Sequence, residues 1–142
     1  MPYQQDIPYY LAPRTKSTYF ISSQHRQLGN PNKSIWTISH EEEIDCFILS
    51  KTSKWISGSV CWGLKPIDNR LDVIGRNSVQ EDIKIAKFVD GDKKNIWHGY
   101  PADCRRKKKD IPDTEILVIW KDKGLIGKSD VRKLKQQMTC NL

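Results

Sequence analysis

Residues 83–101 read Ile-Lys-Ile-Ala-Lys-Phe-Val-Asp-Gly-Asp-Lys-Lys-Asn-Ile-Trp-His-Gly-Tyr-Pro, and this stretch decides the fold expected for the chain. Ile83 and Ile85 alternate with polar neighbours, as in a half-buried strand, and the later Asp-Gly pair is typical of a hairpin turn. We therefore predict a β-hairpin in which residues 83–89 pair with residues 95–100. The alternative is a helix from Glu81, capped by Ser78, but the alternation and the turn favour the hairpin.

The rest of the N-terminal two-thirds predicts a mostly antiparallel sheet with one helix. Residues 27–33 are rich in turn formers and indicate a loop, and Gly58 indicates a bulge or close packing. Residues 1–13, with three prolines and three tyrosines, indicate an arm that is either packed on the domain or loosely held. Strands are expected where aromatic and β-branched residues lie between turn formers, at residues 18–22, 34–38, 54–62 and 71–74.

The one helix of this region is predicted over residues 40–51. Ser39 and Glu42 have the spacing of a capping box, acidic residues fill the first turn, and Ile44, Phe47 and Ile48 recur at helical spacing. A strand over residues 44–49 is the competing interpretation, because these side chains also suit a sheet.

Two short helices are predicted in the C-terminal part, joined by residues 124–128. Pro112 and acidic residues suit the start of the first helix and Gly124 suits its end. Ser129 is the expected N-cap of the second helix, whose apolar stripe would be Val131, Leu134 and Met138.

The chain is therefore predicted to be one α+β domain over residues 1–142, a length that can bury a core without disulfides or metal. Its expected parts are an arm (1–13), a sheet-rich body (14–101), a basic linker (102–111) and a helix pair (112–139). The five tryptophans fall mostly inside predicted elements and are expected in the core. The four cysteines lack the spacing of a metal site and are expected as free thiols.

Positive charge is concentrated at the C-terminal end. Residues 1–104 hold 13 Lys and Arg against 12 Asp and Glu, whereas residues 105–142 hold 11 against 5. Such asymmetry indicates an acidic partner, such as nucleic acid, an anionic membrane face or an acidic protein. No apolar run is long enough to cross a bilayer and no secretory signal precedes the domain, so we expect no membrane partner and a cytoplasmic protein.

The leading hypothesis is a small nucleic-acid-associated protein that contacts the phosphate backbone, DNA or RNA. In a eukaryotic host the basic run at 105–109 would also resemble a nuclear localisation signal. The helix pair has the general form of a helix-turn-helix, although an αα-hairpin packed on the sheet explains the same apolar spacing. The predicted phosphate contacts are Arg105, Arg106, Lys107, Lys108, Lys109, Lys128, Arg132, Lys133 and Lys135.

A second hypothesis is a small nuclease, and the sequence leaves open whether the chain is an enzyme. If residues 95–100 form a strand, Trp97 and Gly99 face one side while His98 and Tyr100 face the other, beside the basic run. His98 and Tyr100 would then be a candidate acid/base pair for phosphodiester cleavage. The alternative is a structural role for both residues.

A third hypothesis is a protein-interaction module, such as an antitoxin-like, inhibitor or accessory subunit, that docks on an acidic partner. The sequence holds no Walker or dinucleotide-binding loop, no G-x-S-x-G, no H-E-x-x-H and no EF-hand loop. We therefore predict no cofactor and no metal site.

Overall fold

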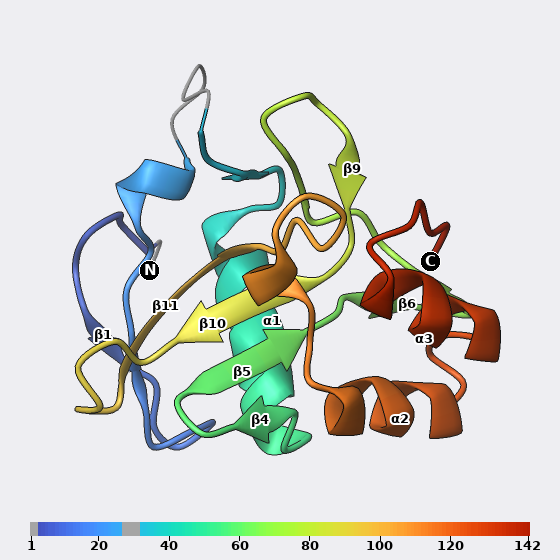
Figure 1. The fold of residues 1–142 in the computed structure, drawn as a ribbon. Coiled ribbons are helices and arrows are strands. Elements are labelled where there is room, and N and C mark those ends of the chain that lie inside the picture. The colour runs from blue at the N-terminus through green and yellow to red at the C-terminus, as the bar shows by residue number, and fades with distance from the viewer. Residues whose placement is uncertain (1–2, 27–31) are drawn as a thin grey trace.

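The computed structural model describes residues 3–26 and 32–142, and it confirms the α+β class. The predicted hairpin is present: β10 (Ala86–Val89) pairs antiparallel with β11 (Ile96–Pro101), and Val89 lies opposite His98. The first predicted strand of that hairpin is divided. Asp82 and Ile83 form a separate strand, β9, that turns away from β10 (Figure 1).

The hairpin lies in the middle of a sheet with the strand order β1-β2-β11-β10-β5-β4. Its pairs are antiparallel except for β11 with β2, which is parallel. The flanking strands are β1 (Tyr9–Tyr10), β2 (Thr18–Tyr19), β4 (Ile56–Ser57) and β5 (Val60–Gly63). The predicted strand at 54–62 is in fact this β4–β5 hairpin, and Gly58 (φ 62°) supplies its left-handed turn residue instead of a bulge.

Two smaller sheets complete the strand arrangement. The pair β6 (Pro66–Ile67) and β7 (Arg70–Leu71) forms a short hairpin, so only the start of the predicted strand at 71–74 is a strand. The other sheet has the order β3-β8-β9, with β3 (Ile35–Trp36), β8 (Gly75–Arg76) and β9 (Asp82–Ile83). The predicted loop at 27–33 falls mainly on residues 27–31, which lie outside the described residues.

The described part of the N-terminal arm, residues 3–13, is packed on the sheet. In addition to the β1–β2 pairing, the backbone N–H of Asp6 donates to the carbonyl of Ile21 at 2.7 Å. The rings of Tyr3 and Tyr9 meet edge to face at 4.9 Å and pack against the core. The segment therefore belongs to the folded body.

The predicted helix is α1 (His40–Thr52), which lies behind the sheet in Figure 1. The capping box is confirmed, because the Ser39 hydroxyl accepts from the Glu42 N–H and the Glu42 carboxylate accepts from the Ser39 N–H. Between α1 and the sheet lies an aromatic core that includes Tyr19, Phe47 and Phe88, all three fully buried.

Two C-terminal helices, α2 (Thr114–Asp122) and α3 (Lys128–Lys135), lie at one side of the sheet (Figure 1). The predicted end of the first at Gly124 is confirmed by its positive φ of 73°. The predicted N-cap Ser129 was wrong: Gly127 caps α3, and its N–H donates to Asp130 at 2.6 Å. Met138 lies beyond α3, because Gln137 (φ 56°) closes the helix, and it is 48% exposed instead of completing the stripe.

A second core lies beneath these helices. It contains Trp55, Trp62 and Trp120 together with Leu117 of α2 and Leu134 of α3. With Trp36 and Trp97 in the first core, all five tryptophans are buried, as predicted. Tryptophan indoles are therefore not a surface for stacking nucleic-acid bases.

Gly99 allows the close approach of β10 and β11, and a larger residue at this position should destabilise the fold. A Cβ atom at Gly99 would lie 2.3 Å from Cδ1 of the buried Phe88 ring. We expect Gly99→Ala to lower the free energy of unfolding by about 1–3 kcal/mol through overpacking. Urea unfolding measures this, with Gly91→Ala as the control, since a Cβ at Gly91 meets nothing within 4 Å. Equal stability of the two variants would contradict the prediction.

Candidate functional site

A cleft of about 550 Å³ opens where β11, the short helix η1 (Ser23–His25), residues 32–34 and the basic run meet. These segments are far apart in the sequence. The histidine, tyrosine and lysine side chains that line the cleft are those of His25, Lys33, His98, Tyr100, Lys107 and Lys109, and the rest of the lining is Asp6, Phe20, Ser22, Ser23, Gln24, Asn32 and Ser34.

Strand β11 brings His98 and Tyr100 to the cleft. Trp97, Gly99 and Pro101 are buried while His98 and Tyr100 are half-buried, so the predicted alternation of faces is confirmed. The hydroxyl of Tyr100 donates to Oδ1 of Asp110 at 3.0 Å. Burial and the Asp110 carboxylate raise the pKa of Tyr100 well above its usual value, so this phenol keeps its proton at neutral pH.

His25 is a residue of this cleft that the sequence did not assign. Its ring stacks on the Tyr100 ring with centroids 5.0 Å apart, and its Nδ1 lies 3.0 Å from the carbonyl oxygen of Ser34. Burial lowers the pKa of His25, and the charges of Lys33, His98 and Lys107 lower it further, although the Ser34 bond opposes this. The His98 ring stacks on Phe20 at 5.3 Å, and burial, then Lys33, lowers the pKa of His98 too.

The residue that follows His25 is held by a buried ion pair. Nη2 of Arg26 lies 2.7 Å from Oε1 of Glu43, whose side chain is fully buried on α1, and the Tyr19 hydroxyl donates to the other carboxylate oxygen. A second guanidinium nitrogen of Arg26 donates to the Ile38 carbonyl. Burial raises the pKa of Glu43 to about 7, against the opposing effects of Tyr19 and Arg26.

The basic run is folded onto the body. Asp110 is 1% exposed and accepts from the Tyr100 hydroxyl and the Asp103 N–H, both at 3.0 Å. Nζ of Lys87 donates to the Lys109 carbonyl at 2.7 Å. These contacts hold the 3₁₀ helix η2 (Lys108–Asp110) against the sheet.

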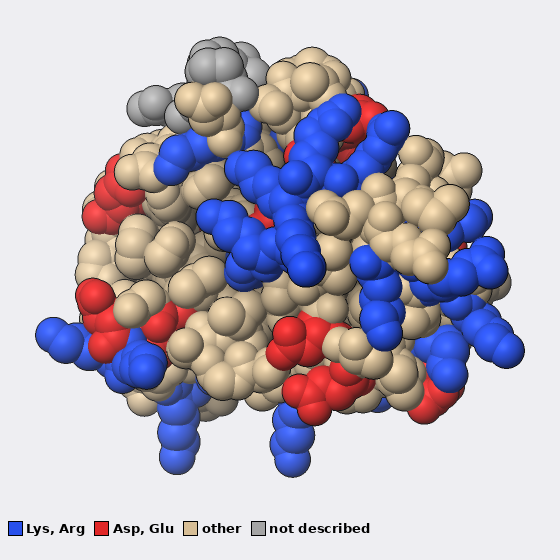
Figure 2. Space-filling model, viewed as in Figure 1, with Lys and Arg blue, Asp and Glu red and all other residues tan. Residues whose placement is uncertain are grey.

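Four of the five charges of the run form two groups, and the fifth, Lys108, is exposed and is not among the residues that line the cleft. Arg105 and Arg106 both pair with Glu81, at 2.7 and 2.9 Å. Lys107 and Lys109 line the cleft, and Nζ of Lys107 lies 3.4 Å from the Asn32 carbonyl oxygen. Figure 2 shows Lys and Arg concentrated in the middle of this face, over the segment between β11 and α2.

The remaining predicted phosphate contacts lie on α3, outside the cleft. Lys128, Arg132 and Lys135 are exposed and Lys133 is half-buried. A second group of positive charge is visible in Figure 2 on the side where α2 and α3 lie. The Gln137 side chain joins this region to the run, because its Nε2 donates to the carbonyls of Cys104 and Arg105 at 3.4 and 3.3 Å.

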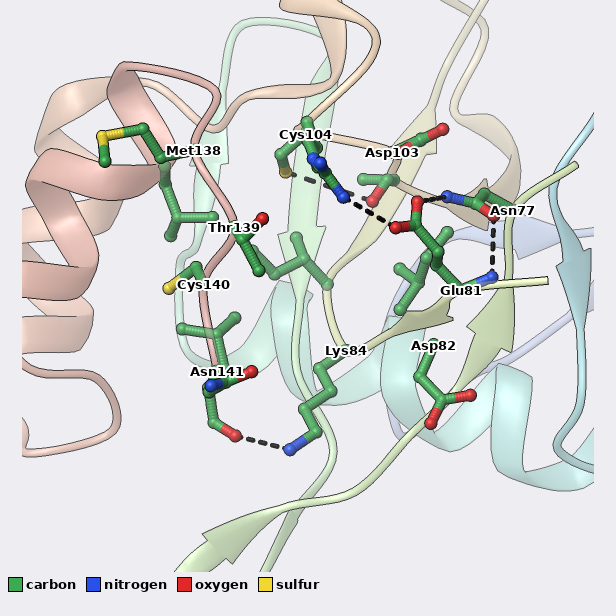
Figure 3. A pocket seen from close by; sticks show the side chains of 16 residues that line it. Asn77, Glu81, Asp82, Lys84, Asp103, Cys104, Met138, Thr139, Cys140 and Asn141 are labelled. Carbon is green, nitrogen blue, oxygen red and sulfur yellow. Dashed lines mark hydrogen bonds and ion pairs between the residues drawn. The ribbon is translucent and has the colours of Figure 1, made fainter. Parts of the chain in front are cut away.

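A second pocket, of about 360 Å³, lies between residues 138–142 and β9 (Figure 3). Two pairs of its polar groups bond to one another: Glu81 accepts from Asn77, and Lys84 Nζ donates to the Leu142 carbonyl oxygen at 2.5 Å. Burial and Asp130 raise the pKa of the Cys140 thiol to about 12, and burial also raises that of Cys104. Protonated thiols and satisfied polar groups make this pocket a poorer candidate site than the histidine cleft.

The described residues place limits on other kinds of site. All four cysteines are free thiols, as predicted. Among residues 3–26 and 32–142, no three His, Cys, Asp or Glu side chains gather in a way that could hold a metal ion. Across the same part of the chain, no helix has the length and apolar character needed to span a bilayer.

Comparisons of the chain with protein-family models, with curated proteins and with solved structures find no match in any of the three. The interpretation of the cleft therefore depends on its own residues. Phe20, His25 and Lys33 were missed in the sequence because they lie in or near a turn-rich segment and belong to no motif. Only a contact between distant segments brings them to His98.

Proposed function

We propose that the chain binds single-stranded nucleic acid, with backbone phosphates held in the cleft by Lys33, Lys107 and Lys109. The observation that supports this is the meeting of these three lysines in one cleft, Lys33 from one segment and Lys107 and Lys109 from the basic run. Basic side chains gain affinity for nucleic acid by releasing counterions from its phosphates.

The rings in the cleft favour a single strand over a duplex. Phe20, His25, His98 and Tyr100 are half-buried and lie beside the lysines in two stacked pairs. Aromatic rings next to a basic groove offer stacking surfaces to unpaired bases, which a duplex keeps in its own stack. The exposed basic side chains of α3 would contact phosphates outside the cleft.

The salt dependence of binding tests this proposal. We expect a labelled single-stranded RNA with 2′-O-methyl groups to bind with a log K that falls against log salt with a slope of about −2, from three lysine contacts at about −0.7 each. Each phosphate contact from α3 would steepen the slope by the same amount. Fluorescence anisotropy measures the slope, and a duplex of the same sequence is the comparison.

Two results would oppose the proposal. Absent binding at low salt, about 50 mM, would end it and leave the acidic-protein hypothesis. A salt-independent affinity would show that the lysines do not meet phosphate.

A further inference from the structure

We propose that the cleft cleaves RNA, with His25 as general base and His98 as general acid. This inference rests on the proposed binding of nucleic acid in the same cleft. The sequence indicated His98 and Tyr100 as the acid/base pair, and His25 now takes the place of Tyr100. The reason is that the Tyr100 hydroxyl donates its proton to Asp110, while the Tyr100 ring is a stacking surface for His25.

The geometry of His25 suits a base. A carbonyl oxygen only accepts hydrogen bonds, so the Nδ1 of neutral His25, 3.0 Å from the Ser34 oxygen, carries the ring proton. Its Nε2 then keeps an available lone pair. The Ser34 carbonyl, the Tyr100 ring and the Arg26–Glu43 ion pair at the adjacent residue together fix this orientation.

His98 lies on the same side of β11 as Tyr100, two residues away, which corresponds to about 6.6 Å along a strand. Because the His25 ring rests on the Tyr100 ring, the two imidazoles flank one region of the cleft. Lys33 lies close enough to both to lower the pKa of each. Lys107 and Lys109 line the same cleft and supply positive charge for a developing phosphorane.

The reaction is an intramolecular transesterification. His25 Nε2 removes the proton from a ribose 2′-hydroxyl, whose oxygen attacks the adjacent phosphorus. The bond from phosphorus to the 5′-oxygen of the next nucleotide breaks, and His98 gives that oxygen a proton. The products are a 2′,3′-cyclic phosphate and a free 5′-hydroxyl, with no change of oxidation state and no water consumed.

The pH profile follows from the requirement for one neutral and one protonated histidine. Burial lowers the pKa of both imidazoles below the usual 6.5, and the lysines of the cleft act in the same direction. Asp6, which also lines the cleft and accepts from the Ser23 N–H, is the carboxylate that would oppose them, and Asp110 is engaged by Tyr100. We expect kcat/KM to be bell-shaped with its maximum below pH 6.5.

The experiment uses one oligonucleotide sequence in two forms. Ribose RNA in EDTA should be cleaved to cyclic phosphate ends, resolved by mass spectrometry, whereas the 2′-O-methyl form lacks the nucleophile and should only bind. Binding of the methylated form without cleavage of ribose RNA between pH 5 and 8 would overturn this inference and leave the proposed function intact. Failure of both forms to bind would remove both proposals.

Histidine variants test which side chains act as the general base and the general acid. We expect His25→Ala and His98→Ala each to lower kcat at saturating RNA by about 10²–10⁴-fold. Each variant should also bind the methylated RNA more weakly, because it lacks one stacking ring, but saturating RNA removes that effect from kcat. His25→Gln keeps a hydrogen-bond donor for the Ser34 carbonyl, so it controls for a loss of activity that is caused by misfolding. It should cleave as slowly as His25→Ala. The third histidine, His40, lies on α1 with its Nδ1 3.1 Å from the Tyr3 carbonyl, and His40→Ala should cleave like the parent. Full activity in either cleft variant would overturn the assignment.

Discussion

Replacing Lys33, Lys107 and Lys109 together with glutamine is expected to weaken binding of single-stranded RNA about 50-fold at 0.15 M salt, and to reduce the salt slope by about 2. The loss follows from three phosphate contacts at about 0.7 released counterions each. Glutamine keeps most of the side-chain length, so the change tests charge. Anisotropy with the 2′-O-methyl RNA measures it without cleavage.

A matched control separates the cleft from the net charge of the chain. Lys16, Lys94 and Lys123 are exposed and lie outside the residues that line the cleft. Replacing these three with glutamine removes the same total charge. If both triple variants lost affinity equally, the binding would depend on overall charge and the cleft would have no special part in it.

Glu43→Gln is expected to lower the free energy of unfolding by about 3–5 kcal/mol at pH 8. The reason is that Arg26, only 10% exposed in its side chain, would keep its charge without a compensating carboxylate. For a chain of this size we expect the melting temperature to fall by roughly 10 °C or more. Thermal and urea unfolding followed by circular dichroism measure the effect.

The same substitution two residues earlier is the control for this prediction. Glu41 is exposed in the first turn of α1, so Glu41→Gln should change stability by about 0.5 kcal/mol or less. A Glu43→Gln protein as stable as the Glu41→Gln protein would show that the buried pair does not support the fold. In that case the anchoring of His25 through Arg26 would also need another explanation.

The parts of the fold that were predicted correctly depend on neighbours in the sequence. The capping box at Ser39 and Glu42, the turn between β10 and β11, and the end of α2 at Gly124 each use residues a few positions apart. The errors were also local. Gly127 competed with Ser129 as the cap of α3, because the Asp130 carboxylate reaches its N–H, and Gln137 closed that helix before Met138.

The candidate site was predictable only in part. The alternation along β11 was enough to place His98 and Tyr100 on one face, and composition was enough to locate the basic run. Composition could not show that Arg105 and Arg106 face Glu81 while Lys107 and Lys109 line a cleft.

The sequence by itself therefore determined the α+β class, the central hairpin, the face shared by His98 and Tyr100, and the excess of positive charge. Only the tertiary structure decided that His25 and Lys33 join them and that the Tyr100 hydroxyl is engaged by Asp110. The physical reason is that strand alternation and helix capping are set by residues near in the chain. The cleft, in contrast, is made by packing η1 and η2 against β11, and neither contact has a local pattern.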